Sequence, residues 1–179
     1  MPFNRRRVWI AAASAFVAVS TGCAPSNDRL ERLARSGNIQ ENAPIKADAS
    51  IEVAAPQQRL WSLLAGIDQW PRWQPDIDAA ALHGSLSPGS QFTWRSGGTS
   101  VRSKLALVEP ITAISWTGQA FGLEAVHVWT FTALPSGRVL VRTRESMDGF
   151  PISVLYPSAK LQESDVRWLA SLKRVAEAK

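Results

Sequence analysis

Cysteine, histidine and tyrosine are scarce in this chain of 179 residues, which has one cysteine, two histidines and one tyrosine. A single cysteine excludes an intramolecular disulfide. One cysteine and two histidines also cannot supply the ligands of a usual structural zinc site. After the N-terminal region there is no apolar run of about 20 residues, the length that a transmembrane helix requires. We therefore predict a domain that is stabilised by its apolar core, and we expect no metal and no cofactor.

Blocks of basic residues are missing from the body of the chain. The formal net charge is +5, but three of the arginines lie in Arg5–Arg7, a segment that we expect to be removed. Without residues 1–23 the chain has 17 basic residues against 15 acidic ones. No cluster of lysine and arginine interleaves with aromatic residues, as it does in many nucleic-acid-binding surfaces. We therefore expect no nucleic-acid partner.

The N-terminus has the pattern of an export signal. Arg5–Arg7 precede twelve mostly apolar residues, Val8–Val19, which are too few to span a bilayer and fit a signal peptide. Small residues before Cys23 resemble a bacterial lipobox, although Ser20 stands where a branched apolar residue is usual. We expect Cys23 to be lipidated and to anchor the protein on the periplasmic side of a bacterial membrane. The alternative is a simple cleaved signal and a soluble periplasmic or secreted protein.

Three regions follow from these patterns: a lipoprotein-type signal peptide at residues 1–23, a linker at 24–47 and one folded domain at 48–179. Within the linker, residues 27–36 could form a short charged helix. The domain begins with a strand near residues 47–54, where Ile51 and Val53 alternate with polar residues.

The apolar pattern in the rest of the domain predicts an α+β fold. After the first strand, apolar residues at helical spacing indicate a short helix that begins near Pro56. From Ile77 onward the apolar period is two, and short turns separate about six runs, which favours an antiparallel sheet of hairpins. Residues 158–178 form the one long amphipathic helix that could cover a face of this sheet. We therefore predict a curved antiparallel sheet wrapped around the C-terminal helix.

Tryptophan is abundant, with eight residues, and two of them stand in the segment Trp70-Pro71-Arg72-Trp73. Proline fixes φ and ends regular structure, so this segment predicts a rigid aromatic corner after the short helix. On the strands, Trp94, Trp116 and Trp129 occupy alternating positions that point to one face. Such tryptophans could be plain core. Their number, together with the corner, favours an internal cavity.

The turn between the last two predicted strands sets a register. A three-residue loop with Gly137 at its last position would place Trp129 opposite Thr143 and His127 opposite Glu145. A slip of one residue would set the apolar positions opposite arginines, so hydrophobic matching selects this register. Opposite side chains lie about 5 Å apart at Cβ. His127 and Glu145 are therefore predicted to be inward-facing neighbours.

Many short matches resemble the START/Bet v 1-like (SRPBCC) superfamily, in its polyketide cyclase/dehydrase and lipid-transport group. The matching segments are Ile51-x-Val53 with Pro56, Leu60-Trp61, Trp70-Pro71-x-Trp73, Pro88-Gly89, Phe92-x-Trp94, Trp116-x-Gly118, His127-x-Trp129 and Glu145-x-x-x-Gly149. The resemblance implies a helix-grip fold, in which a seven-stranded antiparallel sheet grips a long C-terminal helix around a cavity for an apolar ligand. The candidate ligand-binding residues are Trp70, Trp73, Phe92, Trp94, Ser103, Trp116, His127, Trp129 and Glu145.

Three roles are open for His127 and Glu145. They could satisfy each other in the core, orient the polar end of a ligand, or act as a catalytic acid/base pair on a carbonyl compound. The leading functional hypothesis is binding of a hydrophobic or aromatic small molecule. The alternative is a polyketide cyclase/dehydratase-like enzyme, and a third possibility is a protein-interaction module, whose protein partner the sequence does not identify.

Overall fold

The computed structural model describes residues 26–150, 153 and 156–178. The predicted signal peptide and Cys23 lie outside these residues and stay predictions. Alternation along the chain produces seven strands, and the helical patterns produce helices at both ends and after the first strand. The elements are α1 (Ser26–Arg35), β1 (Ile45–Val53), α2 (Gln57–Ala65), η1 (Ile67–Gln69), α3 (Trp70–Trp73), β2 (Ile77–His83), β3 (Gln91–Ser96), β4 (Thr99–Glu109), β5 (Ala113–Ala120), β6 (Leu123–Ala133), β7 (Val139–Asp148) and α5 (Ser158–Glu177).

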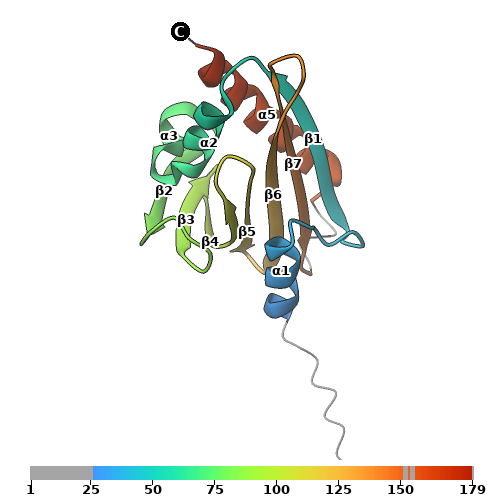
Figure 1. The fold of residues 1–179 in the computed structure, drawn as a ribbon. Helices are drawn as coiled ribbons and strands as arrows, with labels where there is room; N and C mark the ends of the chain where they lie inside the picture. Colours follow the sequence, from blue (N-terminus) through green and yellow to red (C-terminus); the bar gives the residue numbers. More distant parts are fainter. Residues whose placement is uncertain (1–25, 151–152, 154–155, 179) are drawn as a thin grey trace, which may run out of the picture.

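The seven strands form one antiparallel sheet in the order β1-β7-β6-β5-β4-β3-β2. Strands β2 to β7 follow one another as neighbours, as short connections favour, and β1 pairs with β7 at one edge. Figure 1 shows the sheet curving around α5, which lies along one face. The predicted α+β helix-grip architecture is confirmed.

The register that hydrophobic matching predicted for the last hairpin is also confirmed. His127 pairs with Glu145, Trp129 with Thr143, and the pairing continues to the end of the hairpin. Because side chains alternate along a strand, this register turns both His127 and Trp129 toward α5. The structure therefore places a histidine, a carboxylate and an indole on the concave face of the sheet.

Helix α1 corrects the expectation that residues 24–47 are a linker. The helix does form near the predicted residues, and it packs on the outer face of the sheet against β4, β5 and β6 (Figure 1). Leu30 and Ala34 are buried there, and the Ser115 hydroxyl donates a hydrogen bond of 2.6 Å to the carbonyl of Ala34. Strand β1 also begins at Ile45, inside the expected linker. The physical reason is that outward positions of these strands are apolar and need cover: Ala106, Val126 and Val128 pack with α1.

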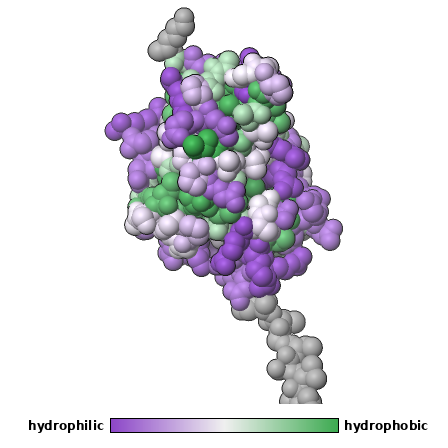
Figure 2. All heavy atoms as spheres, viewed as in Figure 1, coloured by the Kyte–Doolittle hydropathy of each residue, from purple (hydrophilic) through white to green (hydrophobic). Residues whose placement is uncertain are grey.

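The outer face around α1 is otherwise mixed in character. Figure 2 shows hydrophilic side chains over most of the region near α1, with apolar patches scattered across the sheet. An ion pair between the Lys104 ammonium and the Glu31 carboxylate, at 2.8 Å, ties the helix to the sheet. No helix among residues 26–150 and 156–178 has the length and apolarity needed to cross a membrane.

Candidate functional site

Aromatic rings fill the space between the sheet and α5. Trp70 is fully buried, and its indole N–H donates a 2.8 Å hydrogen bond to the carbonyl of Leu64. Its ring lies 5.1 Å, centroid to centroid, from Trp168, a residue of α5 that the sequence analysis did not assign to the site. Trp168 in turn packs edge-on or tilted against three further indoles: Trp73 at 5.8 Å, Trp94 at 6.2 Å and Trp129 at 5.9 Å.

These rings occupy the region where the sequence predicted an internal cavity. Trp73, Phe92, Trp116 and Trp129 are all at most 5% exposed. The structure therefore brings the predicted ligand-binding aromatics together, but as a packed cluster rather than as the wall of an open space. The physical reason is that Trp168 enters from α5 and fills the volume that the sheet and the Trp70-Trp73 corner would otherwise enclose. Ser103 takes a supporting role, because its hydroxyl accepts a 3.1 Å hydrogen bond from the Trp94 indole.

A polar cluster lies beside these rings. His127 is 4% exposed, and its ring lies between Trp116 and Trp129, at 4.8 and 5.4 Å. Its Nδ1 lies 3.5 Å from Oε2 of Glu145, the neighbour that the register predicted. On the other side, its Nε2 lies 2.7 Å from the hydroxyl of Thr143.

Asp165 of α5 completes this cluster, and the sequence analysis missed it. One of its carboxylate oxygens lies 3.9 Å from Nε2 of His127, and the residue is 1% exposed. The sequence did contain a pattern that indicates burial of Asp165. Asp165 stands four residues after Leu161 and three before Trp168, so it occupies a position on the buried stripe of the helix. A charged residue on such a stripe indicates a buried polar site.

Burial sets the electrostatics of the cluster. It lowers the pKa of His127 to about 3 and raises the pKa of Asp165 to about 7, with a smaller contribution from the charge of Asp48. Burial also raises the pKa of Glu145 well above its ordinary value, and the neighbouring Asp165 raises it further. Near neutral pH the imidazole is therefore uncharged, Asp165 is close to the midpoint of its titration, and the raised pKa of Glu145 favours its protonated form. The cluster can donate and accept hydrogen bonds while it carries little net charge.

Several buried polar atoms at this site have no partner among the described residues. The indole N–H groups of Trp73 and Trp129 are two of them, and Oδ2 of Asp165 is a third. A buried donor or acceptor without a partner costs about 1–3 kcal/mol. Two unused donors and one unused carboxyl oxygen thus belong to residues in or beside the aromatic cluster. This arrangement could hold a molecule that has a polar group on an aromatic or apolar body.

The same three titratable residues are the set that could hold a metal ion. Ligand atoms of His127, Glu145 and Asp165 all lie within 4.8 Å of one another. One imidazole and two carboxylates suit several first-row metals. However, the two carboxylates approach different nitrogens of the imidazole ring. These contacts, together with the Thr143 hydroxyl at Nε2, also suit the cluster to hydrogen bonding and proton exchange.

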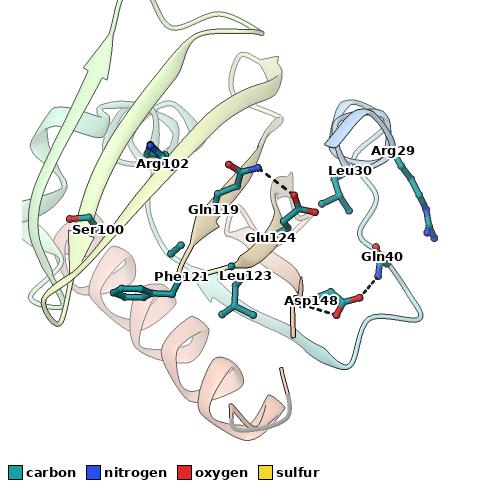
Figure 3. Close-up of a pocket in the computed structure, with 13 residues that line it drawn as sticks. Arg29, Leu30, Gln40, Ser100, Arg102, Gln119, Phe121, Leu123, Glu124 and Asp148 are labelled. Carbon is teal, nitrogen blue, oxygen red and sulfur yellow. Dashed lines mark hydrogen bonds between the residues drawn. The ribbon is translucent and has the colours of Figure 1, made fainter. Parts of the chain in front are cut away.

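A separate hollow lies on the outer face, between α1 and the turn that joins β5 to β6 (Figure 3). Its volume is about 920 Å³, and its lining includes Arg29, Arg102, Gln119 and Glu124. Figure 3 shows Gln119 directed toward Glu124 from the neighbouring strand. The hollow contains none of the residues that the sequence analysis assigned to ligand binding, and it is a polar groove beside the helix.

Comparison with known proteins assigns this architecture and its aromatic interior to a family. The family model described as polyketide cyclase / dehydrase and lipid transport matches residues 44–177. The chain belongs to this family. Its model therefore covers the whole sheet and all of α5, and it leaves α1 outside.

Solved structures of other proteins share the fold at low sequence identity. A hypothetical protein from Helicobacter pylori has a TM-score of 0.69 at 18% identity, over 76% of this chain and 90% of that one. A START superfamily protein from Mycobacterium smegmatis has a TM-score of 0.60 at 14% identity, over 74% and 97%. The Zhui aromatase/cyclase from a Streptomyces species has a TM-score of 0.61 at 15% identity, over 74% and 93%. No curated protein matches the chain significantly.

The raised pKa of Asp165 gives this polyketide cyclase-type domain a stability that depends on pH. An acid whose pKa rises from 3.8 to about 7 on folding contributes stability that is complete below about pH 4 and is lost as the pH rises through 7. Asp165→Asn removes this ionisation and keeps the shape. We expect the unfolding free energy of the variant, relative to that of the wild type, to increase by on the order of 1–3 kcal/mol from pH 5 to pH 8.

Urea unfolding across this pH range measures the difference. Glu163→Gln is the matched control, because Glu163 lies on the same helix and is exposed. The control should follow the wild type at every pH. A difference between Asp165→Asn and the wild type that stays constant from pH 5 to pH 8 would contradict the buried, protonated carboxyl.

Proposed function

We propose that the protein binds a hydrophobic or aromatic small molecule between the sheet and α5, with the polar group of the ligand at His127, Glu145 and Asp165. The observation that carries the proposal is the set of unpartnered polar atoms inside an aromatic interior. A ligand oxygen that accepts from the Trp129 indole would remove one desolvation cost. A ligand hydroxyl that donates to Asp165 would remove another. The family supports binding of this kind, since its description includes lipid transport.

Binding would require the rings to move apart, because the interior is packed in the structure. Trp168 is the ring that fills most of the space, and it is carried by α5 rather than by the sheet. A small displacement of α5 or a rotamer change of Trp168 would open a volume lined by the remaining indoles. The apolar surface of the ligand would then replace the packing that Trp168 gives up.

Tryptophan fluorescence tests the proposal by comparing the wild type with a variant that lacks the indole N–H of Trp129. Trp129→Phe keeps an aromatic ring and removes one hydrogen-bond donor, whose loss is worth about 1 kcal/mol. We expect naphthyl ketones to quench the fluorescence of the wild type on binding, and the variant to bind them about five- to tenfold more weakly. Native mass spectrometry of the protein purified from its own membranes should also show a retained apolar molecule.

The control is Trp61→Phe, because Trp61 lies on α2 and packs edge-on against Phe131, away from the polar cluster. It should bind naphthyl ketones as the wild type does. A protein that retains no apolar molecule and whose fluorescence ignores a panel of apolar aromatic probes would rule out the binding function.

A second function, a polyketide cyclase/dehydratase-like reaction on a carbonyl ligand, is favoured by one observation. Two acids with raised pKa values contact the two nitrogens of one neutral imidazole. A protonated carboxyl can act as a general acid toward a carbonyl oxygen, and a neutral imidazole can accept a proton from carbon. Perturbed titratable groups cluster at catalytic sites, although buried structural pairs also show them.

Single-turnover assays separate this second function from binding alone. If the cluster is catalytic, His127→Ala should lower the rate of conversion of the retained ligand by about 10²–10⁴-fold, the usual contribution of general acid–base catalysis. Equal rates in the variant and the wild type, with the ligand still bound, would remove His127 from catalysis.

We further propose that the protein is exported and anchored by a lipid on Cys23. The proposal rests on the sequence pattern of residues 1–23 and on the position of α1, which begins three residues after Cys23. Metabolic labelling with a palmitate analogue should modify the wild type and leave Cys23→Ser unlabelled. An unlabelled wild type, or an intact N-terminus by mass spectrometry, would favour a soluble protein.

A further inference from the structure

The start of the described chain is fixed to one end of the domain. The side-chain amide of Gln119 on β5 donates a 3.1 Å hydrogen bond to the side-chain oxygen of Asn27, the second residue of α1. Figure 1 shows this end of α1 at the same end of the molecule as the turn that joins β5 to β6. Arg29 and Leu30 of α1 line one hollow together with Phe121 and Gly122 of that turn (Figure 3).

Phe121 is unusual in both its conformation and its exposure. It is the first residue of a two-residue turn between the paired residues Ala120 and Leu123, and its φ is +48°. Turns with positive φ at both central residues favour asparagine, aspartate or glycine at this position. A phenylalanine here bears a steric cost, and its side chain is 73% exposed. Neither the turn nor the core explains an aromatic ring at this point.

A second exposed phenylalanine lies at the same end. Phe150 is 85% exposed and follows Gly149 directly after β7. Gly149 approaches the β5–β6 turn so closely that a Cβ atom on it would lie 2.1 Å from the carbonyl oxygen of Gly122. Two exposed phenylalanines are thus carried by adjacent segments at one end of the domain. We call this end of the domain, which carries Phe121 and Phe150, the phenylalanine end.

The length of chain before α1 limits where a lipid on Cys23 could reach. Two residues lie between Cys23 and Ser26, so the chain takes three residue steps, and an extended chain spans at most about 3.5 Å per step. The lipidated residue would therefore lie within about 10 Å of the start of α1. Because Asn27 is bonded to Gln119 beside the turn, that distance brings the phenylalanine end, and no other end of the domain, close to the bilayer.

We propose that the phenylalanine end rests on the membrane, with Phe121 and Phe150 inserted at the level of the lipid headgroups. Phenylalanine is one of the apolar side chains that peripheral proteins bury at the boundary between headgroups and acyl chains. A lipid on one residue holds the domain at the bilayer, and inserted apolar side chains fix which end of the domain faces it. This placement rests on the lipid anchor proposed above.

The orientation also bears on the class of ligand. Inside the phenylalanine end, Leu123, Met147 and Tyr156 pack around buried Ile45 and Leu161, forming an apolar layer below the polar cluster. Met147 and Glu145 are two residues apart on β7 and so point to the same face. A molecule that leaves the bilayer at this end would meet apolar side chains before it reached Glu145. The proposed ligand is then a compound dissolved in the membrane, such as a lipid or a membrane-soluble aromatic compound.

Site-directed spin labelling of the lipidated full-length protein tests the orientation. Cys23 is the one cysteine of the chain, and its sulfur would carry the lipid, so Phe121→Cys and Phe150→Cys each introduce a single free thiol. Ser136→Cys is the control, because Ser136 is exposed in the turn between β6 and β7, at the opposite end of the strands. Each variant is labelled with a nitroxide and reconstituted into vesicles of phosphatidylethanolamine and phosphatidylglycerol.

We expect the labels at 121 and 150 to be at least threefold more accessible to oxygen, which concentrates in lipid, than to a water-soluble nickel complex, and the label at 136 to show the reverse. Labels at 121 and 150 that are as accessible to nickel as the label at 136 would overturn the orientation while the anchor stands. A nitroxide bound to Cys23 itself in the wild type would show a free thiol there, which overturns the anchor and the orientation with it.

Discussion

The register between β6 and β7 determines where every polar group of the interior lies. It pairs His127 with Glu145 and Trp129 with Thr143 on the concave face of the sheet. A shift of β7 by one residue against β6 would turn Arg142 and Arg144 toward the interior in place of Thr143 and Glu145. The hairpin turn with Gly137 and the alternation of apolar residues both specify the same pairing. The position of the polar cluster is therefore a consequence of hydrophobic matching along the whole hairpin.

Helix α5 adds what the sheet cannot supply. Asp165 brings a second carboxyl group to His127, and Trp168 packs against four indoles, those of Trp70, Trp73, Trp94 and Trp129. Burying three titratable groups next to each other is unfavourable unless they are neutral, and burial shifts their pKa values in that direction. A fold selected only for stability would place leucine at position 165. Asp165 instead places a buried acid there, with one oxygen unpartnered among the described residues, and this is the atom that the proposed ligand would use.

Helix α1 connects the folded domain to the proposed lipid anchor. It covers apolar outward positions of β4 and β6, so the chain before the family's own domain is part of the folded unit. Its first residues are bonded to the end of the sheet that carries Phe121. An anchor attached just before α1 would therefore control the orientation of the whole domain, and not merely its distance from a membrane.

Local sequence patterns were sufficient for the strands, for the C-terminal helix and for the facing of His127 and Glu145, because period-two alternation and turn chemistry act between near neighbours along the chain. They were insufficient for Asp165, because its meeting with His127 depends on how α5 is rotated and seated on the sheet. They also could not show that Trp168 fills the expected cavity, since filling depends on the volume between two layers. The packing of α1 on the sheet could not be predicted for the same reason. The sequence indicated a helix that contains Leu30 and Ala34, but their partners Val126 and Val128 lie about a hundred residues away. Contacts between distant elements were decided by tertiary packing, and the local pattern fixed only which faces were available for them.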